Sequence, residues 1–203
     1  DPLVKKASEE SSTQGRKIPY QAHPSQITEG KTALITPAGE VEIGIFGDHN
    51  LQNLQGALDQ NSPKSVIKAV QDACSANGVR PVAFGVAGLG QNEAENRKLF
   101  EFVKALGAET ITTEPDATAM DLIEKLAVEY NIKVAIHNHP GSPANPNYKY
   151  WDPKYVLSLV QGRSPLLGAC ADTGHWVRSG IKPVDALNIL KGRVVSSHLK
   201  DLH

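Results

Sequence analysis

The stretch Lys133-Val134-Ala135-Ile136-His137-Asn138-His139-Pro140 decides how the rest of the chain is interpreted. A short, mostly apolar run ends here in two histidines that are separated by one residue. Such a run is typical of a strand buried on both faces, as in a parallel sheet. Because side chains alternate along a strand, His137 and His139 are predicted to point to the same side at its C-terminal end.

Similar runs recur on both sides of this stretch and alternate with amphipathic segments. A spacing of roughly 25–35 residues between the runs is that of βαβ units and predicts an α/β fold with parallel strands. We expect strands at about 82–86, 110–113, 133–136, 167–171 and 194–197. We expect helices at about 62–77, 92–106, 118–130, 153–161 and 183–191.

The first sixty residues have a different pattern. Residues 5–17 are polar and charged and are predicted to form a frayed helix or a linker. Two β-prone runs, 32–36 and 41–46, flank a turn at 37–40 and predict a hairpin. We therefore divide the chain into an N-terminal β-hairpin and linker segment, 1–60, and an α/β segment, 61–203.

Composition narrows the class of protein. The chain has 203 residues, of which 40% are hydrophobic, and a net charge of −1. This charge argues against a nucleic-acid partner, which needs an excess of Lys and Arg. No stretch approaches the roughly 18 apolar residues of a membrane helix, so no membrane partner is expected. The two cysteines form no disulfide framework and favour a reducing, cytoplasmic location.

Polar side chains follow four successive strands of the predicted sheet. Parallel α/β folds place their active sites at the C-terminal ends of the strands. A mixture of imidazole and carboxylate groups suits Zn, Mn, Fe, Co or Ni. The sequence therefore predicts a metal site or a polar catalytic rim made of Glu114, His137, His139, Asp172, His175, His198 and Lys200.

Each of these residues also has a structural alternative. Glu114 and Asp116 are in position to cap the following helix, and Asp172 is in position to form an Asx-type turn. His139 precedes a proline and is a candidate turn residue. Lys200 and Asp201 are a candidate solvated charge pair.

Three stretches of residues 62–203 resemble the xylose isomerase-like sugar phosphate isomerase/epimerase superfamily, which includes the AP-endonuclease branch. They are 134–140, 168–176 (with Asp172-Thr173-Gly174-His175) and 192–201 (with His198-Leu199-Lys200-Asp201). The resemblance implies a (β/α) barrel of the TIM type with a divalent metal, Mn, Co, Zn or Mg, at its C-terminal mouth. It also implies that Asp172 and His198 are metal ligands and that His175 contacts the substrate.

The chain departs from the family pattern at two places. His137 stands where the family has a metal-binding Glu, and we expect it to serve as the third ligand. The family's eighth strand, with another Glu, is not matched, so we expect a barrel limited to strands three to seven and an unfinished active site. The remaining candidate catalytic groups are His137, Lys200 and Glu114. Candidate substrate-binding residues are His139, His175, Trp176 and Arg178.

The resemblance implies a metal-dependent sugar or sugar-phosphate isomerase/epimerase that moves a proton between adjacent carbons through an enediolate. One alternative is a metal-assisted hydrolase of the AP-endonuclease type. Another is a non-catalytic or chimeric module. The edges of an incomplete barrel also favour a homo-oligomer.

Residues 18–57 are similar to a stretch of the Mur ligase family, notably UDP-N-acetylmuramate ligases. In that family a His-Asn-x-x-Asn segment borders the ATP site, which corresponds here to His49, Asn50 and Asn53. The phosphate-binding Gly-x-x-Gly-Lys-[Ser/Thr] loop of those ligases is absent from the chain. We interpret this segment as a structural fragment without ATP binding.

Overall fold

The computed structural model describes residues 58–76, 78 and 80–200, and also the backbone of three strands near the N-terminus. These strands are β1 (His23–Thr28), β2 (Lys31–Thr36) and β3 (Gly39–Gly44), which form an antiparallel sheet in the order β1-β2-β3. The β2–β3 pair, with Thr36 opposite Gly39, confirms the predicted hairpin. β1 was not predicted, and its pairing with β2 is irregular between Pro24 and Gln26. The predicted linker at 5–17 lies outside the described residues.

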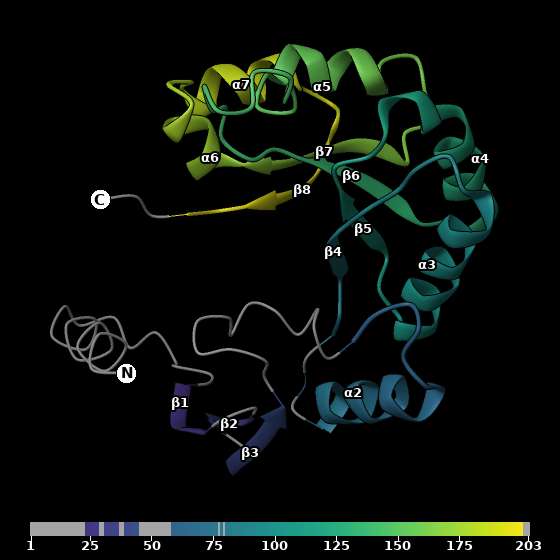
Figure 1. The fold of residues 1–203 in the computed structure, drawn as a ribbon, viewed down its shortest axis with the longest axis vertical. Helices are drawn as coiled ribbons and strands as arrows, with labels where there is room; N and C mark the ends of the chain where they lie inside the picture. The colour runs from purple at the N-terminus through teal and green to yellow at the C-terminus, as the bar shows by residue number, and fades with distance from the viewer. Residues whose placement is uncertain are drawn as a thin grey trace, which may run out of the picture.

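The C-terminal part of the chain forms a five-stranded parallel sheet in the order β4-β5-β6-β7-β8 (Figure 1). Each strand pairs with the next one along the chain, as the repeated βαβ spacing predicts. The α/β fold and all five expected strands are confirmed. Their bounds are β4 (Ala83–Ala87), β5 (Thr110–Thr113), β6 (Lys133–His137), β7 (Leu167–Asp172) and β8 (Val194–His198).

The expected helices are present, and several begin at a side-chain cap. Asn92 accepts hydrogen bonds from the backbone N–H groups of Ala94 and Glu95, and Asp152 accepts one from that of Lys154. Among the described residues, no helix has both the length and the hydropathy needed to cross a membrane. The helices are α2 (Lys64–Ala76), α3 (Glu93–Leu106), η2 (Ala117–Ala119), α4 (Met120–Tyr130), α5 (Pro153–Val160), α6 (Thr173–Arg178) and α7 (Pro183–Ile189).

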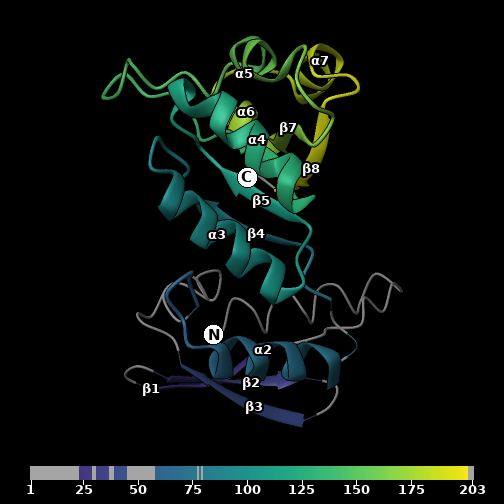
Figure 2. The same cartoon turned by 90° about the vertical axis from the view of Figure 1, so that its right-hand side faces the viewer.

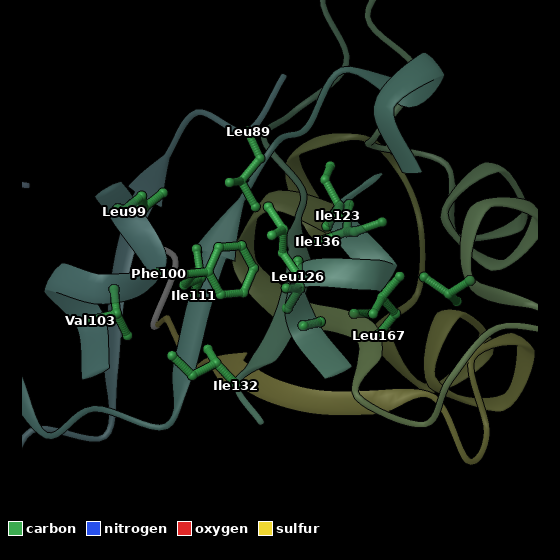
Figure 3. Packing of buried hydrophobic residues seen from close by; sticks show 14 of the residues in the cluster. Leu89, Leu99, Phe100, Val103, Ile111, Ile123, Leu126, Ile132, Ile136 and Leu167 are labelled. Carbon is green, nitrogen blue, oxygen red and sulfur yellow. The ribbon is translucent and has the colours of Figure 1, made fainter. Parts of the chain in front are cut away.

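Helices cover one face of the curved sheet. Figure 1 shows α3 and α4 along one side of it and α5 and α7 above it, and Figure 2 shows α3 and α4 in front of β4 and β5. Apolar side chains of the strands, such as Ile111 and Ile136, pack with Phe100 of α3 and Leu126 of α4 in one core (Figure 3). Burial of this apolar surface is the main stabilising contribution to the fold.

The opposite face of the sheet is lined by smaller and more polar side chains. Cross-strand partners on this face include Thr112 with Ala135, and Cys170 with Ser196. The strands are tightly packed here, because a Cβ at Gly168 would lie only 2.3 Å from the carbonyl oxygen of Arg193. We call this the inner face. The polar residues at the C-terminal strand ends follow the same side-chain alternation and therefore lie on this face.

Candidate active site

The C-terminal ends of β5, β6, β7 and β8 bring their polar residues to one place on the inner face. His137 pairs in register with Cys170, and Asp172 pairs with His198. Glu114 follows β5 in the same alternation as Thr112. The sequence prediction that these side chains lie together at one rim agrees with the geometry.

Asp172 is the centre of this cluster and is fully buried. Its Oδ2 lies 3.4 Å from His137 Nε2 and 3.4 Å from His198 Nδ1. The same oxygen accepts a hydrogen bond from Lys200 Nζ at 2.7 Å. The ammonium of Lys200 also donates to His175 Nε2 at 2.7 Å. One carboxylate oxygen therefore faces three imidazoles and one ammonium, since His175 Nε2 is 3.6 Å away.

The other half of Asp172 has a structural role. Its Oδ1 accepts a hydrogen bond from the backbone N–H of His175 at 3.0 Å and so caps α6. The buried side chain of Asn138 spans β6 and β7, accepting from Asp172 N at 2.9 Å and donating to Asp172 O at 3.1 Å. The structural alternative for Asp172, a turn that caps the segment after it, is thus correct for Oδ1, while Oδ2 faces the rim.

Glu114 forms the second carboxylate of the site. Its Oε1 lies 3.1 Å from His137 Nδ1 and also contacts His139 Nδ1. The hydroxyl of Tyr148 accepts a hydrogen bond from the backbone N–H of His139 at 2.7 Å. The helix-capping alternative is correct for Asp116, whose side chain accepts from Thr118 N, whereas Glu114 turns toward the histidines.

The environment fixes the charge state of several of these groups. Burial alone would raise the pKa of Glu114, but its hydrogen bonds with His137 and His139 outweigh burial and lower it. Burial also acts upward on the pKa of Asp172, and the hydrogen bonds from Lys200 and the backbone of His175 lower it overall. Burial lowers the pKa of His175 to about 4, against the opposing charge of Asp172. At neutral pH the two carboxylates are ionised and His175 is a neutral acceptor.

The donor set around Asp172 fits a divalent metal ion. A separation of 3.4 Å is long for a hydrogen bond, but ligand atoms around one metal with bonds near 2.1 Å are about 3.0–3.4 Å apart. The contact with the Lys200 ammonium indicates that Asp172 Oδ2 faces a position suited to positive charge. His137, Asp172 and His198 form one cluster with ligand-like spacing, and Glu114, His137 and His139 form a second.

The remaining predicted site residues are placed differently. His175 is buried, and its Nε2 accepts a hydrogen bond from the ammonium of Lys200. Trp176 is 1% exposed and belongs to the hydrophobic core cluster. Arg178 is exposed and lines a separate cavity with Tyr148 and Trp151. We therefore do not retain Trp176 as a substrate-binding residue.

Sequence reasoning did not single out Asn138, Tyr148 or Gly174. Asn138 lies between His137 and His139 at the end of a predicted strand, and this position was the sequence feature that could have marked it as a site residue. Tyr148 lies in a loop with no periodic pattern, so nothing in the sequence linked it to His139. Gly174 leaves space for Lys200, because a Cβ there would lie 2.7 Å from Lys200 Cβ.

Comparison with known proteins identifies the family. Residues 39–203 match the family described as the xylose isomerase-like TIM barrel, so the chain belongs to this family and its sheet is part of a TIM-type barrel. No curated protein sequence matches the chain. The Mur ligase resemblance of residues 18–57 finds no support in these comparisons, and the family match begins inside that stretch.

Solved structures agree with this assignment. An uncharacterized protein from Parabacteroides distasonis ATCC 8503 is 39% identical, with a TM-score of 0.58 over 71% of this chain and 56% of that chain. A D-psicose 3-epimerase, solved in the presence of D-fructose, is 13% identical with a TM-score of 0.57 over 70% of this chain and 60% of that chain. An AP endonuclease, family 2, from Brucella melitensis is 14% identical, with a TM-score of 0.54 over 68% of this chain and 64% of that chain. The chain thus spans less than two thirds of these relatives.

Proposed function

We propose that this chain carries part of the active site of a metal-dependent sugar or sugar-phosphate isomerase/epimerase. The observation that supports this most strongly is the approach of His137 Nε2 and His198 Nδ1 to the same oxygen of Asp172. The structural likeness to an enzyme named D-psicose 3-epimerase is a second argument for sugar chemistry. A metal held there would polarise a substrate carbonyl and stabilise the charge that develops on its oxygen.

In this proposal His137, Asp172 and His198 are the ligands. Glu114 fixes the tautomer of His137: its Oε1 accepts the Nδ1 proton, so the lone pair of Nε2 faces Asp172. Both nitrogens of His137 are thereby engaged. We therefore assign it to metal binding and not to proton transfer.

In this proposal His139 transfers the proton and Lys200 binds a substrate oxygen. The side chain of His139 is half exposed, and its contact with Glu114 through Nδ1 leaves Nε2 available to take a carbon-bound proton and return it to the neighbouring carbon. Glu114 orients His139 through the contact of its Oε1 with Nδ1. Lys200, held by Asp172 and His175, donates a hydrogen bond to a substrate oxygen.

Exchange of solvent deuterium into ketoses tests this function. The full chain is loaded with Mn²⁺ or Co²⁺ in D₂O and incubated with D-fructose, D-psicose, D-tagatose or their phosphates, and deuterium beside the carbonyl is followed by NMR. We expect incorporation with the intact chain and its loss in Asp172→Asn. Asp185→Asn, a change at an exposed position of α7, is the matched control. Metal-loaded protein that exchanges no deuterium into any of these sugars would contradict the proposal.

The number of histidines at the rim favours one second candidate, metal-assisted hydrolysis of a phosphoester. The rings of His137, His139, His175 and His198 lie within 4.6–5.8 Å of one another in several pairs. Overlapping clusters of this kind are suited to more than one metal ion. Hydrolysis of bis(p-nitrophenyl) phosphate without deuterium exchange would favour this candidate.

Other expectations from the sequence remain proposals. They are the division of the chain at residues 60 and 61, a homo-oligomeric state, a cytoplasmic location and the absence of a nucleic-acid partner. The identity of the metal is also a proposal, because Mn, Co, Zn and Mg all suit a site with imidazole and carboxylate ligands to differing degrees.

A further inference from the structure

A cavity of about 380 Å³ lies beside the rim, between the loop that follows β6 and the end of α6. Its lining includes Asn145, Tyr148 and Trp151 from the loop, and Arg178 and Ser179 from the α6 end. The volume is in the range of small-molecule sites.

Hydrogen bonds connect the wall of this cavity to the rim. Tyr148 accepts from the backbone N–H of His139 at 2.7 Å. On the other side, Ser179 Oγ accepts from Gly141 N at 3.1 Å and donates to the carbonyl of His175 at 2.8 Å. The cavity wall is thus built on the backbone of two rim residues, and a ligand with its reacting end at the rim has this cavity as its neighbour.

The apolar part of the wall is the indole of Trp151. A Cβ on Gly141 would lie 3.1 Å from two atoms of this ring, so the ring rests directly on the glycine backbone. An indole held in this way is a flat surface against which the carbon skeleton of a sugar packs. The amide of Asn145 is a hydrogen-bonding group in the same wall.

The polar part of the wall carries an unpaired positive charge. Among the described residues, Arg178 has no ion-pair or hydrogen-bond partner, whereas Arg80, Arg97 and Arg163 each pair with a carboxylate. None of the described residues that line the cavity is an Asp or a Glu. A free guanidinium with its planar set of donors is suited to bidentate binding of a phosphate or carboxylate.

We propose that the cavity binds the anionic end of the substrate, a phosphate or carboxylate group at Arg178, with the adjoining carbons against Trp151. This inference rests on the proposed function for the position of the reacting end. It narrows the substrate class from sugars in general to sugars with an acidic group, either a sugar phosphate or a uronate.

Tryptophan fluorescence tests this proposal on the full chain. Of the two tryptophans, Trp176 is buried in the core and Trp151 lines the cavity. Titration with D-fructose 6-phosphate and with D-glucuronate is compared with D-fructose, and calorimetry measures the same affinities independently. We expect saturable binding of one or both anionic sugars, with the tighter one identifying the group. We expect the unchanged chain to bind D-fructose about tenfold or more weakly than the anionic sugar. We expect Arg178→Gln to bind the anionic sugar more weakly than the unchanged chain by a similar factor.

Arg80→Gln, which changes an exposed arginine that pairs with Glu109, is the matched control and is expected to bind like the unchanged chain. Trp151→Phe is expected to lose the fluorescence signal. Equal affinity for D-fructose, or unchanged affinity in Arg178→Gln, would overturn the proposal. Arg178-dependent binding of an anionic sugar without deuterium exchange would retain the cavity assignment and reject the isomerase reaction. Deuterium exchange without Arg178-dependent binding of an anionic sugar would support the isomerase reaction and reject the cavity assignment.

Discussion

The two faces of the five-stranded sheet use the same strands for different purposes. Outward positions such as Ile111 and Ile136 join the hydrophobic core beneath the helices. Inward positions such as Thr112 and Cys170 are small or polar, and at the strand ends they give way to His137 and Asp172. Along one strand, the outward side chains thus contribute to stability and the inward side chains lead to the candidate site.

This difference implies that the two faces respond differently to substitution. On the outer face the cost of a change follows the apolar volume removed. At the rim the cost follows the loss of partners for buried polar groups. Single substitutions on each face therefore distinguish the two contributions.

Phe100→Ala on the outer face is expected to have the largest effect. Phe100 is fully buried between α3 and the sheet, so the change removes a large side chain from a closed core. We expect unfolding free energy to fall by about 3–5 kcal/mol. Urea denaturation measures this. A loss below about 1 kcal/mol would mean that the outer face is not the main source of stability.

Asn138→Ala is expected to destabilise by about 1–3 kcal/mol, because it leaves the buried N–H and C=O of Asp172 without their side-chain partners. It also frees Asp172 to move, so metal affinity is expected to fall. Denaturation with and without Mn²⁺ measures both effects. Asn188→Ala, at an exposed position of α7, is the control and should stay within about 0.5 kcal/mol. Asn138→Ala with stability and metal affinity of the unchanged chain would refute this role.

Glu124→Gln tests an electrostatic contribution on the helical side. Glu124 accepts hydrogen bonds from the backbone N–H of Ser164 at 2.6 Å and from Arg163 at 2.8 Å, and these lower its pKa. A carboxylate whose pKa is lowered on folding contributes stability above its unfolded pKa and loses it as the pH falls through the folded value. We expect Glu124→Gln to cost about 1 kcal/mol at pH 7 and much less at pH 3.

The measurement for Glu124 is urea denaturation of both proteins between pH 7 and pH 3, with Asp185→Asn as the control. The stability difference between Glu124→Gln and the unchanged chain should narrow as the solution becomes acidic. A difference that is constant with pH would show that the contact is not electrostatic.

His139→Ala is expected to have the smallest effect on stability, within about 0.5 kcal/mol, because half of its side chain is exposed. His137→Ala is the paired variant. His137 is 2% exposed and sits between two carboxylates, so its loss is expected to cost clearly more. Thermal denaturation of the two variants compares them. Equal losses would contradict the separation between the buried and the exposed part of the rim.

Much of the fold could be predicted from the sequence, because the strands are short apolar runs at regular spacing. The run before His137 and the run before Asp172 were both located within about one residue. α6 was missed because six residues give no helical periodicity and the helix begins directly at the strand end. β1 was missed because its six residues, HPSQIT, include a proline and a single aliphatic side chain.

The site could be predicted only in outline. Strand alternation placed Glu114, His137, Asp172 and His198 at one rim, since parallel strands end at the same edge. Alternation does not report burial or side-chain partners. It could not separate Trp176, which packs in the core, from Arg178, which lines a cavity. It also could not assign the two oxygens of Asp172 to a helix cap and to the rim.

Anomalous X-ray diffraction from crystals of the full chain grown with Mn²⁺ or Zn²⁺ tests the central claim most directly. The account predicts a metal peak bounded by His137 Nε2, Asp172 Oδ2 and His198 Nδ1, which persists in His139→Ala and disappears in Asp172→Asn. A peak only between Glu114 and His139, or no peak in metal-saturated crystals, would contradict it.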